Sequence, residues 1–152
     1  MRESIVISDA GCLIAFIGIS RLSLLKDLYK QVYITRTVRN EVKHELPEWI
    51  HVVEDSGLPM LDISIKLDPG ELSAIQYALT QENALLLIDE KKGRRVAQQL
   101  GISITGVVGI LIRAKQEGLI QSGREELDKL QADGFWISER LRQLFLTAVD
   151  EN

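Results

Sequence analysis

Four acidic residues are candidates for a shared cluster that could catalyse a reaction. Asp9 and Asp89 each follow a short apolar run. Glu41 lies in a charged helical stretch, and Glu71 opens another helix. Carboxylates gathered in one place raise each other's pKa, and a divalent cation relieves their repulsion. With oxygen ligands and little imidazole, the expected ion is Mg²⁺ or Mn²⁺, which activates water and screens a phosphate during phosphodiester hydrolysis.

Other reactive side chains fit other chemistry poorly. The two histidines, His44 and His51, lie near no serine or cysteine in a nucleophile elbow. The single cysteine, Cys12, lies in an apolar run, so a buried core position is expected. One cysteine also excludes an internal disulfide and a zinc site made of several thiolates. The sequence has no Walker motif and no dinucleotide-binding fingerprint.

Each acidic residue also has a purely structural explanation. Asp9 could cap the helix that follows it, and Asp89 could cap the helix formed by the basic run KKGRR. Asp68 and Glu71 have the spacing of a capping box. Glu41 could be a solvated helix charge, and the basic run could be an exposed helix face. The shared position at strand ends favours the metal site over these alternatives.

The elements that must position the acids alternate between strands and helices. Apolar or β-branched runs predict strands at residues 4–8, 31–35, 84–89 and 102–105. Helical periodicity and capping signals predict helices at residues 12–19, 22–29, 37–46, 67–79, 91–100, 106–118, 122–130 and 138–149. In the less regular stretch, residues 49–54 could continue a helix, and residues 61–65 alternate weakly like an edge strand.

This alternation implies parallel crossovers and a sheet covered on both faces, and so an α/β fold. Ligands of such sheets bind beyond the carboxyl ends of the strands, where Asp9 and Asp89 stand. The length of 152 residues, with 45% hydrophobic residues, predicts a single domain over residues 1–152. The formal net charge of -4 means that contact with a polyanion requires a local basic patch or a metal ion.

The apolar stretch at residues 10–19 is the only segment that suggests a targeting signal. It is too short to span a bilayer. Asp9 precedes it, and no small-residue cleavage site follows. We therefore expect a cytoplasmic protein with no membrane partner.

The motifs resemble a known family. The segments VISDAGCLIAF, ITRTVRNEV, LDPGELSAIQYAL and LLLIDEKKGRRVAQQLGISITGVVGILIRAKQEGLI are similar to PIN domains, most of all to the PIN-like subfamily related to VapC-type toxin ribonucleases. The similarity runs from about Ser4 to Ile120, and the tail FWISERLRQLFLTA resembles that subfamily too. The resemblance implies a three-layer Rossmann-like fold and a metal-dependent endoribonuclease that cleaves single-stranded or loop RNA.

The resemblance also assigns residues to roles. By position, the family's catalytic and metal-binding acids are Asp9, Glu41, Glu71 and Asp89. Thr105 falls near a hydroxyl that the family often has at a strand end, and Thr105 and Glu90 are expected to support the site from behind the metal ligands. The expected phosphate contacts are Lys92, Arg94 and Arg95, with Arg36 and Arg39 as further candidates.

The sequence departs from the family pattern at two positions. Gly11 stands where the family usually has serine, threonine or asparagine, and Glu90 where the subfamily more often has aspartate. Loss of a side chain that supports metal ligands weakens metal affinity. An alternative function is therefore a PIN-like binding or regulatory module with weak catalysis. A phosphoacceptor domain is a third possibility, but the basic run is unlike the lysine placement of receiver domains.

Proteins of the toxin type usually work with an antitoxin that covers the cleft, and PIN domains often form homodimers. Both partners are implications of the resemblance. The sequence adds one amphipathic stretch near the end of the chain, with its apolar residues Trp136, Ile137, Leu141, Leu144 and Phe145. Its apolar face could serve a partner or pack into the core, and core packing is the more common use.

Overall fold

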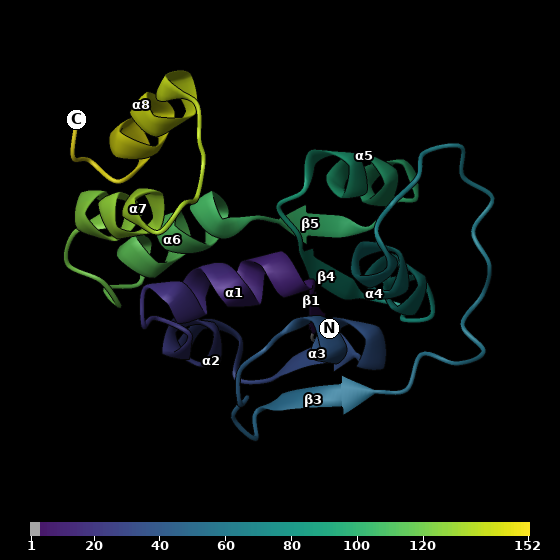
Figure 1. The fold of residues 1–152 in the computed structure, drawn as a ribbon. Coiled ribbons are helices and arrows are strands. Elements are labelled where there is room, and N and C mark those ends of the chain that lie inside the picture. The colour runs from purple at the N-terminus through teal and green to yellow at the C-terminus, as the bar shows by residue number, and fades with distance from the viewer. Residues whose placement is uncertain (1–3) are drawn as a thin grey trace.

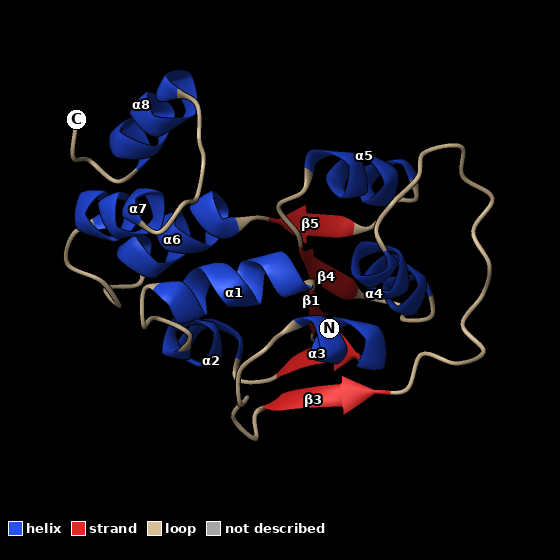
Figure 2. Ribbon diagram, in the orientation of Figure 1, coloured by secondary structure: helices blue, strands red, loops and turns tan. Residues whose placement is uncertain are grey.

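A computed structural model describes residues 4–152 as a central parallel sheet with helices on both faces (Figures 1 and 2). The strands are β1 (Ile5–Ser8), β2 (Val32–Thr35), β3 (Ile50–Val53), β4 (Ala84–Leu87) and β5 (Ser103–Thr105), in the order β3-β2-β1-β4-β5. The helices are α1 (Ala10–Gly18), α2 (Ser23–Tyr29), α3 (Arg36–Glu41), α4 (Pro69–Leu79), α5 (Lys91–Gln99), α6 (Val107–Gln116), α7 (Gly123–Ala132) and α8 (Glu139–Ala148). The predicted three-layer α/β fold is confirmed.

Side chains of the central strands alternate between two hydrophobic clusters. Val6 of β1 and Leu87 of β4 belong to a larger cluster with residues of α1, α2, α6 and α7. Ile7 and Leu86 belong to a smaller cluster with residues of α4 and α5. Both faces of these strands are therefore covered, which is why their sequences are continuous apolar runs.

The segment between α3 and α4 differs from the sequence-based prediction. α3 ends at Glu41, well before Pro47, because the next residue already has an extended backbone. Residues 49–54 do not continue a helix, since Ile50–Val53 forms β3 and pairs in parallel with β2. The β-branched residues of this segment pair with β2, and this pairing outweighs local helix propensity.

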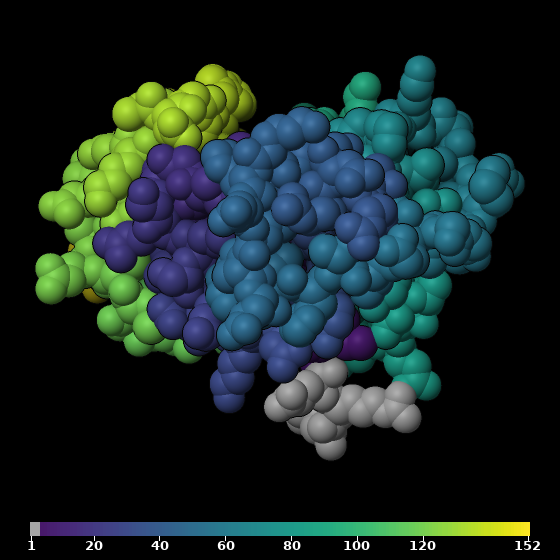
Figure 3. Space-filling view, turned by 60° about the horizontal axis from the view of Figure 1, so that its bottom comes forward, coloured from purple at the N-terminus to yellow at the C-terminus, as the bar shows by residue number. Residues whose placement is uncertain are grey.

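In Figure 3, the segment from α2 to β3 covers the middle of the face that is shown.

The predicted edge strand at residues 61–65 is wrong, because this segment pairs with no strand and belongs to a long loop. Its alternation is nevertheless real. Leu61, Ile63 and Ile65 pack against the smaller cluster, while Asp62 and Ser64 are exposed. A period of two therefore marks an extended chain here, and not a strand of the sheet.

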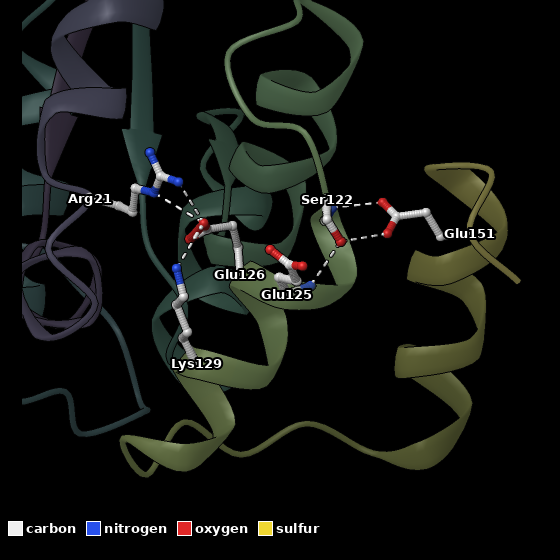
Figure 4. A network of polar contacts seen from close by, with 7 residues as sticks. Arg21, Ser122, Glu125, Glu126, Lys129 and Glu151 are labelled. Carbon is white, nitrogen blue, oxygen red and sulfur yellow. Dashed lines mark hydrogen bonds and ion pairs between the residues drawn. The ribbon is translucent and has the colours of Figure 1, made fainter.

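Polar contacts attach α7 to the rest of the molecule (Figure 4). The buried carboxylate of Glu126 accepts hydrogen bonds from Arg21 at 2.8 and 3.0 Å and from Lys129 at 3.4 Å. At the start of α7, Glu151 accepts from the Ser122 hydroxyl at 2.9 Å. Polar contacts thus hold both ends of the first turn of α7, in addition to the burial of Leu127 and Leu130 in the larger cluster.

The amphipathic stretch near the chain end divides between core and surface. Ile137 and Phe145 are buried in the larger cluster. Trp136, Leu141 and Leu144 remain exposed. Within residues 4–152, no helix is long and apolar enough to cross a membrane.

Candidate active site

A cavity of about 370 Å³ is lined by six carboxylates, at the edge where the strands end. These belong to Asp9, Glu41, Asp68, Glu71, Asp89 and Glu90. The strand order explains the position: β1 lies between β2 and β4, so the crossovers diverge there and leave a crevice. All four acids singled out in the sequence line this one cavity. Asp68, which the sequence suggested only as a helix cap, lines it as well.

Asp9 joins β1 to α1 and lies against the cavity. Its backbone N–H donates to the Leu87 carbonyl of β4 at 3.0 Å, and its Oδ1 accepts from the Cys12 backbone at 2.9 Å. It therefore caps α1, as the structural alternative expected, and lines the cavity at the same time. Burial raises the pKa of Asp9 to about 7, and the nearby charge of Asp89 adds to this shift.

Asp89 is held from two sides. Both of its carboxylate oxygens accept from the Val107 backbone at the start of α6, at 3.2 Å. The Cys12 thiol donates to Oδ2 at 3.5 Å. Burial raises the pKa of Asp89. The proposed alternative that Asp89 caps α5 is wrong, because Glu90 occupies that position and accepts from the Lys92 backbone.

Cys12 was predicted to be a core residue, and it is fully buried. It also contacts both aspartates, since its backbone binds Asp9 and its thiol binds Asp89. The sequence held no signal for this second contact, because residues 12 and 89 meet only when β1 pairs with β4.

Glu71 and Glu41 lie on other parts of the cavity wall. Glu71 forms a capping box with Asp68 at the start of α4, as predicted. Its Oε2 is buried and has no hydrogen-bond partner among the described residues. Burial, together with the contact to Asp68, raises the pKa of Glu71 to about 8. Glu41, at the end of α3, is half-buried, and burial and the charge of Asp68 raise its pKa too.

Glycines make room for two of these carboxylates. A Cβ atom on Gly106 would lie 2.5 Å from Asp89 Oδ1. A Cβ on Gly93, inside α5, would lie 3.2 Å from Glu71 Oε2 and 2.7 Å from the side chain of Ile88. Glycine inside a helix costs about 1 kcal/mol relative to alanine, so its presence in KKGRR was a signal of close approach.

Gly70 lies beside Glu41, and Gly11 lies beside Asp9, but the two glycines differ in how much space they leave for a side chain. A Cβ on Gly70 would overlap the carboxylate of Glu41, so this glycine is required for their approach. A Cβ on Gly11 would lie 3.7 Å from Asp9 Oδ2, which is ordinary contact. The position where the family usually has a hydroxyl or amide therefore has space for one.

The acidic side chains suit a cation that keeps several bound waters better than a cation enclosed entirely by protein ligands. Among residues 4–152, no three His, Cys, Asp or Glu side chains come close enough to hold one ion together. Mg²⁺ is usually bound by one or two carboxylates and keeps several waters. Asp9 and Asp89, which both contact Cys12, form such a pair. Glu71 lines the same cavity, while its unpaired Oε2 is buried.

A basic cavity of about 350 Å³ adjoins the acids on the surface of α5. Its lining includes Asp89, together with Lys91, Arg94 and Arg95, which lie on one face of the helix. Lys92, predicted to contact substrate, lies on a different face. Within residues 4–152, no carboxylate forms an ion pair with these four cations.

The other predicted contacts lie elsewhere. Arg36 pairs with Glu54 at 2.8 Å, and Arg39 donates to the Val42 carbonyl at 3.1 Å. Thr105 ends β5 and lines a further cavity beside the acidic one, next to Gly109.

A family model described as "PIN domain" matches residues 5–151. The chain belongs to the PIN domain family. The predicted membership in the PIN domain family is thereby confirmed, and it indicates nuclease activity in general. No curated protein and no solved structure matches this PIN domain significantly.

Proposed function

We propose that this PIN domain is a Mg²⁺- or Mn²⁺-dependent endoribonuclease that hydrolyses phosphodiester bonds in single-stranded or loop RNA. One observation carries the proposal: six carboxylates, from segments far apart in the chain, line a single cavity. Burial of so much negative charge is costly, as the raised pKa of Asp9 and of Glu71 indicates. A divalent cation offsets this cost.

In the proposed mechanism, Asp9 and Asp89 would hold the cation, and Glu41 and Glu71 would accept hydrogen bonds from water in the cavity. When bound, the ion lowers the pKa of water and offsets charge that develops on the phosphate. Glu71 lines the cavity, and its pKa of about 8 lies near neutrality, so its ionised carboxylate is suited to accept a proton from the attacking water.

The basic face of α5 supports RNA as the substrate. Lys91, Arg94 and Arg95 are close to Asp89 and would contact phosphates that flank the cleaved bond. A recessed acidic cavity suits a single strand, since a duplex cannot bend one phosphate into it.

Substitution of the two aspartates tests the proposal. Asp9→Asn and Asp89→Asn each keep the size of the side chain and one acceptor oxygen but remove its charge. We expect each variant to retain the melting temperature within a few degrees and to lose at least 100-fold in Mn²⁺-dependent cleavage of a single-stranded RNA, measured on gels. Glu45→Gln, a change in an exposed side chain outside the cavity, is the control. Cleavage that persists in EDTA or in both variants contradicts the proposal.

A second candidate is a binding or regulatory module with little catalysis. Gly11 favours it, because no hydroxyl supports Asp9 at that position. Calorimetry with Mn²⁺ distinguishes the two: binding at micromolar to low millimolar metal supports the enzyme, and no binding at that concentration supports the module.

We also propose, from the resemblance alone, a cytoplasmic toxin whose antitoxin covers the acidic cavity, with a homodimer as a possible assembly. Expression of the chain should arrest growth, and co-expression of a small DNA-binding protein encoded beside it should restore growth. Arrest by the Asp9→Asn variant would contradict a toxic nuclease.

A further inference from the structure

A second cavity adjoins the acidic one and differs from it in chemistry. It has a volume of about 630 Å³ and lies between α5, α6 and the residues that join α7 to α8. Asp89, Glu90 and Phe135 line both cavities, so the two are neighbours at the candidate active site. A ligand cleaved at the acids would therefore extend into this second cavity.

One wall of the second cavity is aromatic and apolar. Trp136 lines it and has 81% of its surface exposed. Leu141 lines it as well and is 40% exposed. A large aromatic ring left in water forgoes the free energy of burial, so a bound ligand that covers it gains that free energy. Phe135 lies half-buried between this wall and the acids.

Another part of the cavity wall, at the start of α5, carries two cations beside the carboxylates of Asp89 and Glu90. Lys91 and Arg94 of α5 line the second cavity, and both also line the basic cavity with Arg95. Within the described residues neither forms an ion pair with a carboxylate. A protein partner with an apolar face would cover Trp136 but leave these charges unmatched. A polyanion that also carries flat apolar rings matches both walls.

We propose that the second cavity binds nucleobases of single-stranded RNA beside the cleaved phosphate, with Trp136 stacked on a base and Lys91 and Arg94 in contact with the flanking phosphates. The inference rests on the proposed nuclease function and deepens it by naming a base-binding subsite. Aromatic platforms in a cationic groove are a general way to hold single strands, because every base has a face that stacks.

The fluorescence of Trp136 reports on this contact directly. The chain has two tryptophans, so Trp49→Phe leaves Trp136 as the sole one. Asp9→Asn in the same protein prevents cleavage during the titration. We expect a single-stranded oligoadenylate of about twelve nucleotides to quench the fluorescence saturably, since a stacked base lies against the indole. The same backbone with abasic residues should quench little and bind about 5-fold to 100-fold more weakly.

Substitution of Trp136 tests its role in affinity. Trp136→Ala should weaken oligoadenylate binding by about 5-fold to 100-fold, and Trp136→Phe should retain most of the affinity. Leu144→Ala is the matched control, because Leu144 is also exposed, at 58%, but does not line the cavity. In the protein that retains Asp9, Trp136→Ala should raise KM with little change in kcat, because stacking acts equally on substrate and transition state.

Several results overturn the subsite. These are equal quenching by the abasic strand, unchanged RNA affinity in Trp136→Ala, and a dimer that Trp136→Ala dissociates while RNA affinity stays the same. The last result would identify the cavity as a protein interface. Failure of the nuclease is a separate result. Quenching of the Asp9→Asn protein by oligoadenylate, with no cleavage by the protein that retains Asp9 under any metal condition, supports the base-binding subsite and contradicts the enzyme.

Discussion

Single residues around the acids decide how well the cavity holds a cation, and Gly11 is the clearest example. The space beside it is open toward Asp9 Oδ2. We predict that Gly11→Ser fits, places a hydroxyl within hydrogen-bonding reach of Asp9, and raises Mn²⁺ affinity on the order of tenfold in calorimetry. Gly11→Ala, which adds the Cβ without the hydroxyl, should leave the affinity near its original value. Equal affinities for both variants would show that the hydroxyl has no supporting role.

At Gly106, unlike at Gly11, there is no space for a side chain beside the neighbouring aspartate. A Cβ there would lie 2.5 Å from Asp89 Oδ1 and 3.1 Å from a guanidinium nitrogen of Arg94. The backbone at Gly106 is extended, so alanine is tolerated by the chain itself. We predict that Gly106→Ala displaces Asp89 and lowers both Mn²⁺ affinity and cleavage at least tenfold, with a melting temperature close to the original. Gly11→Ala is the matched control, and a Gly106→Ala protein with full activity would contradict the prediction.

At the scale of residues, the sequence identified side chains that can act chemically, such as carboxylates. It did not identify residues that act by leaving space for a neighbouring side chain. Carboxylates that follow strands are visible, because the chain order places them at one sheet edge. Cys12 was expected only as a core residue, and Gly106 gave no signal, because a sequence does not report which side chain approaches a residue that lacks a Cβ. Lys91 was passed over in favour of Lys92, because the helical face that turns toward the cavity depends on where α5 begins.

At the scale of elements, the start of α7 depends on one carboxylate from the end of the chain. Glu151 accepts from Ser122, from the backbone N–H of Gly123 at 2.6 Å and of Arg124 at 3.1 Å, and pairs with Lys115 at 3.4 Å. Burial raises the pKa of Glu151, but the hydrogen bonds from Arg124 and Gly123 outweigh it, and the pKa is lowered overall. A negative charge at a helix N-terminus also interacts favourably with the helix dipole.

We therefore predict that Glu151→Gln lowers the free energy of unfolding by about 1–2 kcal/mol at pH 7, measured with urea. Because the folded pKa is depressed, the stabilisation is present above the unfolded pKa of about 4.3 and disappears as pH falls through the folded pKa. The difference between Glu151→Gln and the original chain should thus shrink as pH falls below the unfolded pKa of about 4.3. Glu45→Gln should cause no comparable loss, and a difference that stays the same as at pH 7 throughout acidification would show that charge is not its cause.

Elements with capping signals were predictable, and elements defined by distant partners were not. The capping box of Asp68 and Glu71 located the start of α4 within a residue. The segment that forms β3 carries no comparable signal, because its structure is decided by pairing with β2. Long-range pairing is invisible to local periodicity, and so the same β-branched residues could be taken for helix or strand.

At the scale of the whole molecule, the acidic cavity makes stability depend on pH and on metal. The pKa of Asp9 is raised to about 7 and that of Glu71 to about 8, so the folded state binds more protons than the unfolded state between about pH 4 and pH 8. Stability without metal should therefore fall as pH rises through this window. A bound cation requires the ionised acids, so its effect should grow over the same window.

We predict that Mn²⁺ raises the melting temperature more at pH 8 than at pH 6, relative to EDTA, as measured by scanning fluorimetry. Asp9→Asn should reduce both the loss of stability with pH and the effect of Mn²⁺. Equal shifts at the two pH values would contradict the assignment of these acids to a metal site.

The fold class itself was accessible from the sequence, because alternating strands and helices leave few topologies other than a parallel sheet. The layer of the helices that lie between two strands in the sequence follows from the right-handed crossovers, whereas α6, α7 and α8 come after the last strand and are placed by packing. The sequence did not predict the distances among the acids, because these distances depend on side-chain packing within each layer.

The pairing of β1 with β4 also determines how late in synthesis the acidic cavity can form. Asp9 and Asp89 are brought together by strands that pair across most of the chain, and Asp89 is oriented by the backbone of Val107. During synthesis on the ribosome, the first aspartate emerges long before the elements that complete its surroundings. Under the proposed function, a nascent chain should therefore not cleave the messenger and transfer RNA around it until translation has passed the start of α6.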